Sequence, residues 1–170
     1  MALAVNALSG FGTGIVAGGC TPDYSNTGGT GDRQSIITVT EAGWDNALDQ
    51  EVVDGITPGS NGGYFTGTNS ASLWVKFDFK SGNAVVINEF RVYHSSATAT
   101  DGNWRIDGSN NDSDWDDLSG TVAADNGTGN PWLYNFDNTE AYRYYRHIGV
   151  SGTNAAQWHI EWEFQICGLD

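Results

Sequence analysis

Short runs of residues with strand character recur along most of this chain, and turn-rich segments separate them. The runs lie at residues 35–40, 72–79, 84–94, 103–109, 131–138, 141–150 and 157–168. Short strands spaced in this way, between segments rich in Gly, Asn, Asp and Ser, are typical of an antiparallel sandwich or barrel. Residues 40–55 could hold one short helical turn. We therefore expect an all-β protein, specifically an antiparallel β-sandwich.

Several of these runs alternate apolar and polar residues with the period of two that a half-buried strand requires. Phe90 and Val92 would face one side of a strand, and Arg91 and Tyr93 the other. The same alternation predicts that four residues of the C-terminal run point inward: Ile160, Trp162, Phe164 and Ile166.

The length and the charge of the chain limit its organisation and its partners. A chain of 170 residues fits one domain, which we place at residues 33–170. Residues 1–32 are small, polar and Gly-rich without periodicity, which indicates an arm or anchor that a neighbour would order. The net charge of −14 repels phosphate backbones and anionic lipids, so we expect no nucleic-acid binding. The N-terminal apolar clusters are too short to insert into a membrane and make a poor signal peptide.

Four segments, in order, resemble the discoidin family, also called the coagulation factor V/VIII type C family. They are WDNALD with VVDG (44–49 and 52–55), LWVKFDF running into VINEFRVY (73–79 and 86–93), WRIDGSNNDSDWDDL (104–118), and YRYYRHIGVSGTNAAQWHIEWEFQICG (142–168). The resemblance covers residues 44–168. It implies a galactose-binding-like β-jelly-roll and a non-catalytic recognition module, usually for sugars and sometimes for lipid head groups or proteins.

The third segment holds five aspartates between Asp107 and Asp117, which suggests a calcium loop. An EF-hand starting at Asp112 fails, because Asp117 stands where Gly is required and Ala123 where a bidentate Glu belongs. We instead predict a turn whose Asn and Asp side chains bond their own backbone. In this prediction Trp115 packs into the core.

The resemblance implies a second kind of calcium site. Discoidin-like sugar-binding modules carry a structural calcium ion, and Asp49 or Asp54 together with Glu163 match the positions of its ligands. The loop after Asp54 is longer than is usual in the family. The alternative interpretation of Glu163 is a solvated strand residue.

A sugar site needs an aromatic face for the apolar C–H groups of the sugar and fixed polar side chains for its hydroxyls. We expect the exposed loop candidates to be Trp44, Tyr64, His94, Trp132, Trp158 and His159, joined by Asn103 after His94. In galactose-binding relatives this loop supplies an Arg, where Ser95 or Ser96 stands here, so galactose is not the expected sugar. We expect Arg143 and Arg146 to form structural ion pairs rather than a lipid site.

Two further features concern covalent chemistry. Cys20 and Cys167 lie near opposite ends of the chain and could form a disulfide, or they could be two unpaired, partly buried thiols. The sequence has no Cys and His constellation and no Gly-x-Ser-x-Gly motif, so we expect no enzymatic activity.

These observations lead to one functional hypothesis and two alternatives. The hypothesis is a carbohydrate-recognition module on the surface of a virion or gene-transfer particle, which binds host-cell polysaccharide and contacts other particle proteins through residues 1–32. One alternative is a secreted or cell-surface carbohydrate-binding module from a larger protein. The other is a purely structural capsid or tail decoration protein. The sequence leaves open whether the chain forms a homo-oligomer.

Overall fold

The computed structural model describes residues 37–44, 50–54, 63–65, 70–94, 102–123, 131–152 and 157–167. The predicted arm at residues 1–32, its boundary with the domain, and Cys20 lie outside these residues. Cys167 ends a strand, but its side chain is not described, so the disulfide stays a prediction. No helix in the described ranges is long and apolar enough to cross a membrane.

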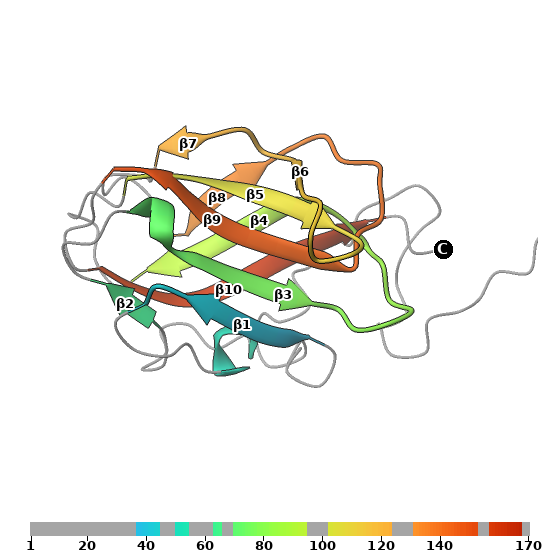
Figure 1. Cartoon of the computed structure of the whole chain (residues 1–170), viewed down its shortest axis with the longest axis horizontal. Helices are drawn as coiled ribbons and strands as arrows, with labels where there is room; N and C mark the ends of the chain where they lie inside the picture. The colour runs from blue at the N-terminus through green and yellow to red at the C-terminus, as the bar shows by residue number, and fades with distance from the viewer. Residues whose placement is uncertain are drawn as a thin grey trace, which may run out of the picture.

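Two antiparallel sheets face each other across the core (Figure 1). The larger sheet has the order β1-β3-β9-β5, and two short strands, β6 and β7, both pair with β5. Its strands are β1 (Thr38–Ala42), β3 (Trp74–Asp78), β5 (Asn103–Ser109), β6 (Asp116–Asp117), β7 (Val122–Ala123) and β9 (Tyr144–Ser151). The smaller sheet has the order β2-β10-β4-β8, with β2 (Gly63–Phe65), β4 (Val86–His94), β8 (Trp132–Asn135) and β10 (Gln157–Cys167).

The predicted strands and the predicted fold class are confirmed. Each of the seven predicted runs overlaps one of the longer strands, although β1 and β9 extend beyond the runs predicted for them. The short helical turn expected in residues 40–55 is the 3₁₀ helix η2 (Gln50–Val53). A second 3₁₀ turn, η3 (Ser70–Ser72), precedes β3. The period of two survives in the burial of β4, where Phe90 and Val92 are buried and Arg91 and Tyr93 are half-buried.

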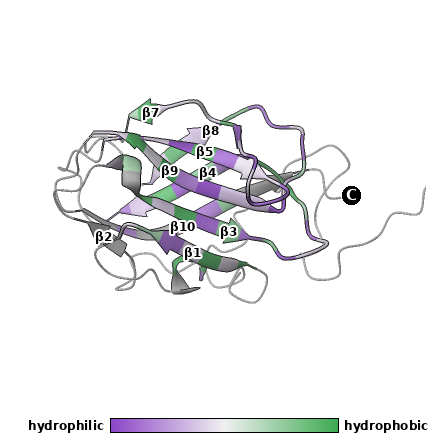
Figure 2. Ribbon diagram, viewed as in Figure 1, coloured by the Kyte–Doolittle hydropathy of each residue, from purple (hydrophilic) through white to green (hydrophobic). Residues whose placement is uncertain are grey.

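Aromatic rings from both sheets interlock in the core, and Figure 2 shows apolar and polar positions alternating along the strands. The ring of Phe164 lies 4.5 Å from that of Phe90 and 4.9 Å from that of Phe77, in edge-to-face geometry. Trp162 and Phe164 both point inward, as predicted. Edge-to-face pairs of this kind stabilise a fold beyond the burial of their apolar area.

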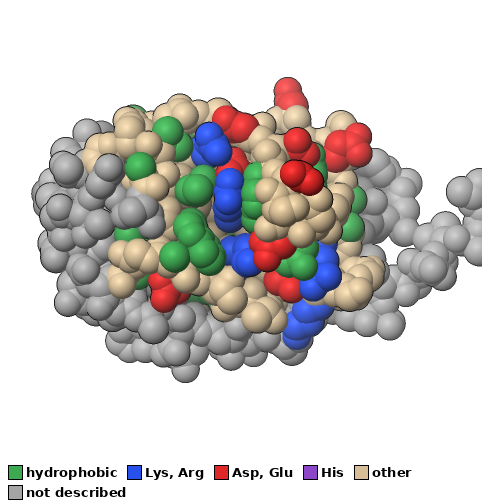
Figure 3. Space-filling view, in the orientation of Figure 1, with side chains coloured by type: hydrophobic (Ala, Val, Ile, Leu, Met, Phe, Trp, Pro, Cys, Tyr) green, Lys and Arg blue, Asp and Glu red, His purple; other side chains and the backbone are tan. Residues whose placement is uncertain are grey.

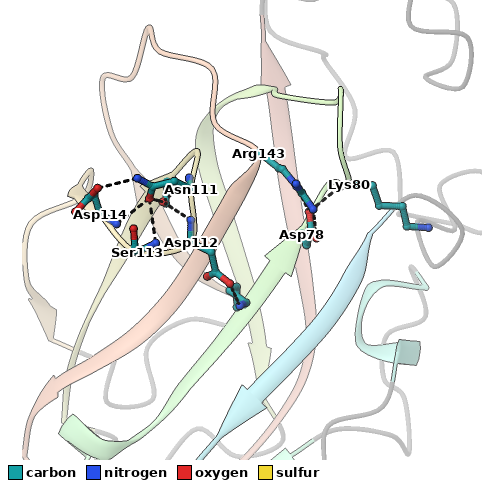
Figure 4. Close-up of polar contacts among 9 residues, drawn as sticks. Asp78, Lys80, Asn111, Asp112, Ser113, Asp114 and Arg143 are labelled. Carbon is teal, nitrogen blue, oxygen red and sulfur yellow. Dashed lines mark hydrogen bonds and ion pairs between the residues drawn. The ribbon is translucent and has the colours of Figure 1, made fainter.

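The aspartate-rich turn after β5 is a network of side chains that bond the local backbone (Figure 4). Asn111 Oδ1 accepts the backbone N–H groups of Ser113 and Asp114 at 3.0 and 2.8 Å. Asp117 Oδ1 accepts the N–H of Gly120 at 2.8 Å. The predicted backbone-bonding turn is therefore confirmed.

The position predicted for Trp115 is wrong. Trp115 is half-buried outside the core, and the guanidinium of Arg146 lies 4.1 Å from its ring centroid. The register explains this placement. Asp117 pairs with Asp107, whose side chain is on the outer side of the larger sheet, away from the core between the sheets. Trp115 lies two residues before Asp117 and therefore on the same side.

Candidate functional site

Most of the predicted sugar-binding residues meet at one end of the sandwich. His94 is the last residue of β4, Asn103 the first of β5 and Trp132 the first of β8. The sheet register brings His94 opposite His159, and Asn103 opposite Ser151. These strand ends gather at the left of Figure 1, and we call this region the His94 end.

Three of the candidates are buried, so the prediction that they are exposed loop residues is wrong. His94 is 1% exposed, Trp132 3% and His159 0%. His94 continues the inward alternation of β4, and Trp132 occupies a core-facing position of β8. A register shift between His159 and Glu161 lets His159 point into the core together with Trp162.

The buried candidates form a continuous aromatic cluster. The ring of Trp132 lies 4.6 Å from that of His94 and 5.1 Å from that of His159. Trp44, which is half-buried, lies 5.1 Å from His159, and its indole N–H donates to the backbone oxygen of Trp74 at 3.0 Å. Trp44 therefore closes the cluster on the side of β3.

His147 joins this cluster, and the sequence analysis did not single it out. The indole N–H of Trp162 donates to His147 Nδ1 at 3.3 Å, and Nε2 lies 3.0 Å from the hydroxyl of Tyr134. An indole nitrogen only donates, so Nδ1 carries no proton and Nε2 carries it. Burial, with a smaller effect from His159, holds the pKa of His147 well below its usual range. In β9 every second residue from Tyr145 onwards faces the core, and this period of two could have predicted that His147 is buried.

The described rim of the His94 end carries polar side chains on a tightly packed backbone. Asn103 Nδ2 donates to Ser151 Oγ at 2.8 Å, and both residues are accessible to solvent. Below them, the N–H of Ser70 donates to the oxygen of Gly152 at 3.0 Å. A Cβ on Gly149 would overlap the carbonyl oxygen of Ser70, so η3 packs directly on the backbone of β9. The close packing holds the rim in a fixed position.

Tyr64 and Trp158 are opposite each other in the register of β2 and β10, next to the pair of Gly63 and His159. Their backbones therefore border the same end of the sandwich. Their side chains lie outside the description, so their roles in binding stay predictions.

The predicted calcium ligands do not assemble into a site among the described residues. Asp49 lies outside them, and Asp54 follows η2 in a half-buried position. Glu163 is buried, which makes its interpretation as a solvated residue wrong. Its Oε2 accepts the hydroxyl of Tyr93 at 3.0 Å and lies 3.9 Å from Arg91 Nη1, and a neighbouring guanidinium disfavours a cation. No group of three or more His, Cys, Asp or Glu that could hold a metal occurs in the described part of the chain, and calcium binding stays a prediction.

The sequence matches no protein-family model and no curated protein. Solved structures do resemble the fold. A family 32 carbohydrate-binding module of AlyQ, in complex with 4,5-unsaturated mannuronic acid, has a TM-score of 0.57 and 19% identity over 76% of this chain and 94% of its own. The family 32 module of Clostridium perfringens NanJ, in complex with galactose, has a TM-score of 0.57 and 14% identity over 79% of this chain and 96% of its own.

A third structure is chitosan-binding module 1 of the chitosanase/glucanase from Paenibacillus sp. IK-5. It has a TM-score of 0.52 and 18% identity over 76% of this chain and 94% of its own. At these identities the likeness establishes the fold. The chain has the galactose-binding-like β-sandwich fold that carbohydrate-binding modules of this kind adopt.

Proposed function

We propose that the chain is a non-catalytic carbohydrate-binding module that binds a glycan at the His94 end. The observation that carries this proposal is the likeness of 76–79% of the chain to carbohydrate-binding modules, two of which hold galactose or 4,5-unsaturated mannuronic acid. Another similar structure holds GalNAc-β-1,3-galactose. Modules of one fold bind different sugars, so the likeness supports the class of ligand rather than one sugar.

The geometry of the His94 end suits this role. A sugar-binding site needs polar groups in fixed positions, because ordering them on binding would cost affinity. Asn103 Nδ2 donates to Ser151 Oγ, and this hydrogen bond fixes the orientation of the Asn103 side chain. Its amide oxygen can then accept a hydrogen bond from a sugar hydroxyl. The aromatic cluster below the rim supports it. We therefore assign ligand contact to Asn103 and a supporting role to the buried candidates. Contact through Tyr64 and Trp158 is a prediction from the sequence.

The larger setting of the module is a separate part of the proposal. Attachment to a larger protein fits the comparisons, because one similar structure joins a module of this kind to an alginate lyase domain. Display on a virion or gene-transfer particle through residues 1–32 is a prediction from the sequence, and the comparisons offer it no support. A calcium ion at Asp49, Asp54 and Glu163 likewise rests on the sequence resemblance.

Titration calorimetry with neutral oligosaccharides tests the binding site. We expect a glycan found by array screening to bind the wild type, and Asn103→Ala to weaken it about tenfold, because a lost hydrogen bond to a sugar costs about 1–2 kcal/mol. Asn135→Ala is the matched control, since Asn135 is exposed on β8 and outside the rim. Circular dichroism checks that both variants fold. Binding to no glycan, or equal losses in the two variants, would refute the proposal.

A further inference from the structure

The outer face of the larger sheet carries a group of side chains that the proposed function does not use. The register places Ile148 between Trp74 and Arg105 in one row across β3, β9 and β5. In the next row Arg146 lies between Lys76 and Asp107. We call the surface formed by Trp74, Lys76, Arg105, Arg146 and Ile148 the basic face. Figure 3 shows this side of the molecule, with apolar and basic side chains gathered at its centre and acidic ones among and around them.

Two arginines of the basic face share one fully buried carboxylate. Arg105 Nε lies 2.6 Å from Asp107 Oδ1, and Arg146 binds Asp107 Oδ2 through Nε at 2.8 Å and through Nη2 at 2.7 Å. The three groups together carry one net positive charge. A buried carboxylate is costly unless it is fully paired, so both guanidiniums are held firmly in place.

Both guanidiniums remain within reach of a ligand. The side chain of Arg105 is 32% exposed and that of Arg146 is 20% exposed. Trp115 holds Arg146 from the other side, since the guanidinium lies 4.1 Å from its ring centroid. A guanidinium has five N–H donors, and Arg105 uses Nε and Nη2 on Asp107. Two fixed, partly exposed guanidiniums side by side form a receptor for a single carboxylate.

The charge of the basic face differs from that of the whole chain. The chain has seven Lys and Arg and a net charge of −14. Four of the seven lie on the outer face of this one sheet, paired by three carboxylates. The four are Lys76, Arg105, Arg143 and Arg146, and their carboxylate partners are Asp112, Asp107 and Asp78. Asp117 also lies beside Arg105, so the basic groups and carboxylates of this face balance, and the face lacks the excess negative charge with which the whole chain repels anions.

We propose that the basic face binds an acidic sugar residue of an otherwise neutral glycan. The sugar carboxylate binds Arg105 and Arg146, and the apolar C–H face of a neighbouring sugar ring lies on Trp74 and Ile148. Trp74 and Arg105 are two strands apart, about 10 Å at the usual strand spacing, which a disaccharide spans. Asp107 acts as a positioning residue that fixes both guanidiniums. This surface adjoins the His94 end, because Asn103 lies two residues before Arg105 on the same face of β5, so the tests below compare acidic with neutral sugars to distinguish the two proposals.

The test compares sugars that differ in one carboxylate. Isothermal titration of the whole chain is done with 3′-sialyllactose, with a glucuronate-terminated disaccharide, and with lactose as the neutral reference. We expect at least one acidic sugar to bind at least tenfold more tightly than lactose, and its methyl ester to lose this gain. The two acidic sugars show which kind of acidic residue fits. No preference for either acid, or an unchanged affinity for the ester, would overturn the proposal.

Two variants with the same change in net charge separate the basic face from general electrostatics. Arg105→Gln should abolish the preference for the acid, while Arg91→Gln, on the smaller sheet, should keep it. Trp74→Ala, a half-buried position on the same face, should weaken binding about fivefold and serves as the test if Arg105→Gln does not fold. Equal effects of Arg105→Gln and Arg91→Gln, or no effect of Trp74→Ala, would contradict the assignment. Asn103→Ala should leave the preference for the acidic sugar over lactose unchanged.

Discussion

The protonation state of His147 gives a quantitative prediction about stability. The imidazole is fully buried, its Nδ1 accepts the indole N–H of Trp162, and the hydroxyl of Tyr134 lies against its Nε2. The other rings near it belong to Trp104 and His159, so the described ring and hydrogen-bond partners include no carboxylate that would stabilise an imidazolium. Burial therefore keeps His147 neutral in the folded state below the pH at which it is protonated in the unfolded chain.

The sign and the size of the effect follow from linkage. The folded pKa of His147 is lowered, so below the unfolded value of about 6.5 the unfolded chain binds a proton that the folded protein does not. Above about pH 7.5 the protonation of His147 does not lower the free energy of unfolding, and below that pH it lowers this free energy progressively. The loss is about 1.4 kcal/mol at pH 5.5 and up to about 2.7 kcal/mol at pH 4.5.

Urea denaturation followed by tryptophan fluorescence at pH 8.0, 5.5 and 4.5 measures this loss. His147→Gln cannot titrate, so its free energy of unfolding should depend less on pH than that of the wild type, by the amounts given above. Tyr134→Phe is the control: it removes one hydrogen-bond partner, lowers stability at every pH, and keeps the wild-type slope. If His147→Gln and the wild type had the same slope between pH 8.0 and 4.5, the assignment of a neutral, buried imidazole would be wrong.

Three other predictions concern the scaffold. Gly149→Ala should lower the free energy of unfolding by at least about 2 kcal/mol in urea denaturation, because its Cβ overlaps the carbonyl of η3, and a neutral effect would contradict this packing. Phe164→Ala should cost about 3–5 kcal/mol, whereas Leu133→Ala, at 49% exposure, should change the same measurement by less than about 0.5 kcal/mol. Arg143 lowers the pKa of Asp78, so a double-mutant cycle of this partly exposed pair should give a small favourable coupling at pH 7 that is lost as the pH falls below about 4. A coupling that does not change with pH would refute the ion pair.

The sequence predicted the fold because the long strands obey a simple rule. In β4 the buried Phe90, Val92 and His94 alternate with half-buried residues, and in β9 the buried Tyr145, His147 and Gly149 do the same. Alternation failed where the element was too short to show a period. β6 contains only Asp116 and Asp117, and the outward position of Trp115 follows from its pairing with β5 rather than from any local pattern.

The sequence named residues that gather at the His94 end, but it did not predict that they would meet there. Strand ends can be read from a sequence, so the positions of His94 and Trp132 at the ends of strands were predictable. Their burial was not, because histidine and tryptophan occur both in cores and at binding sites, and the bulge that turns His159 inward leaves no local sequence signal. The two arginines on Asp107 were predicted only in part: Arg146 was expected in an ion pair, while their convergence depends on the register of β5 against β9.

The burial of the aromatic cluster determines how binding experiments on this protein should be interpreted. Replacing His94, Trp132 or His159 would remove core packing, so a loss of glycan binding in such a variant would measure instability as much as recognition. Asn103 is half-exposed, and its replacement removes a hydrogen-bond donor and acceptor without opening a cavity, whereas replacing Arg105 also removes a partner of the buried Asp107 and costs stability. A loss of affinity at unchanged free energy of unfolding is therefore the signature of a ligand contact here, and only the half-exposed positions can give it.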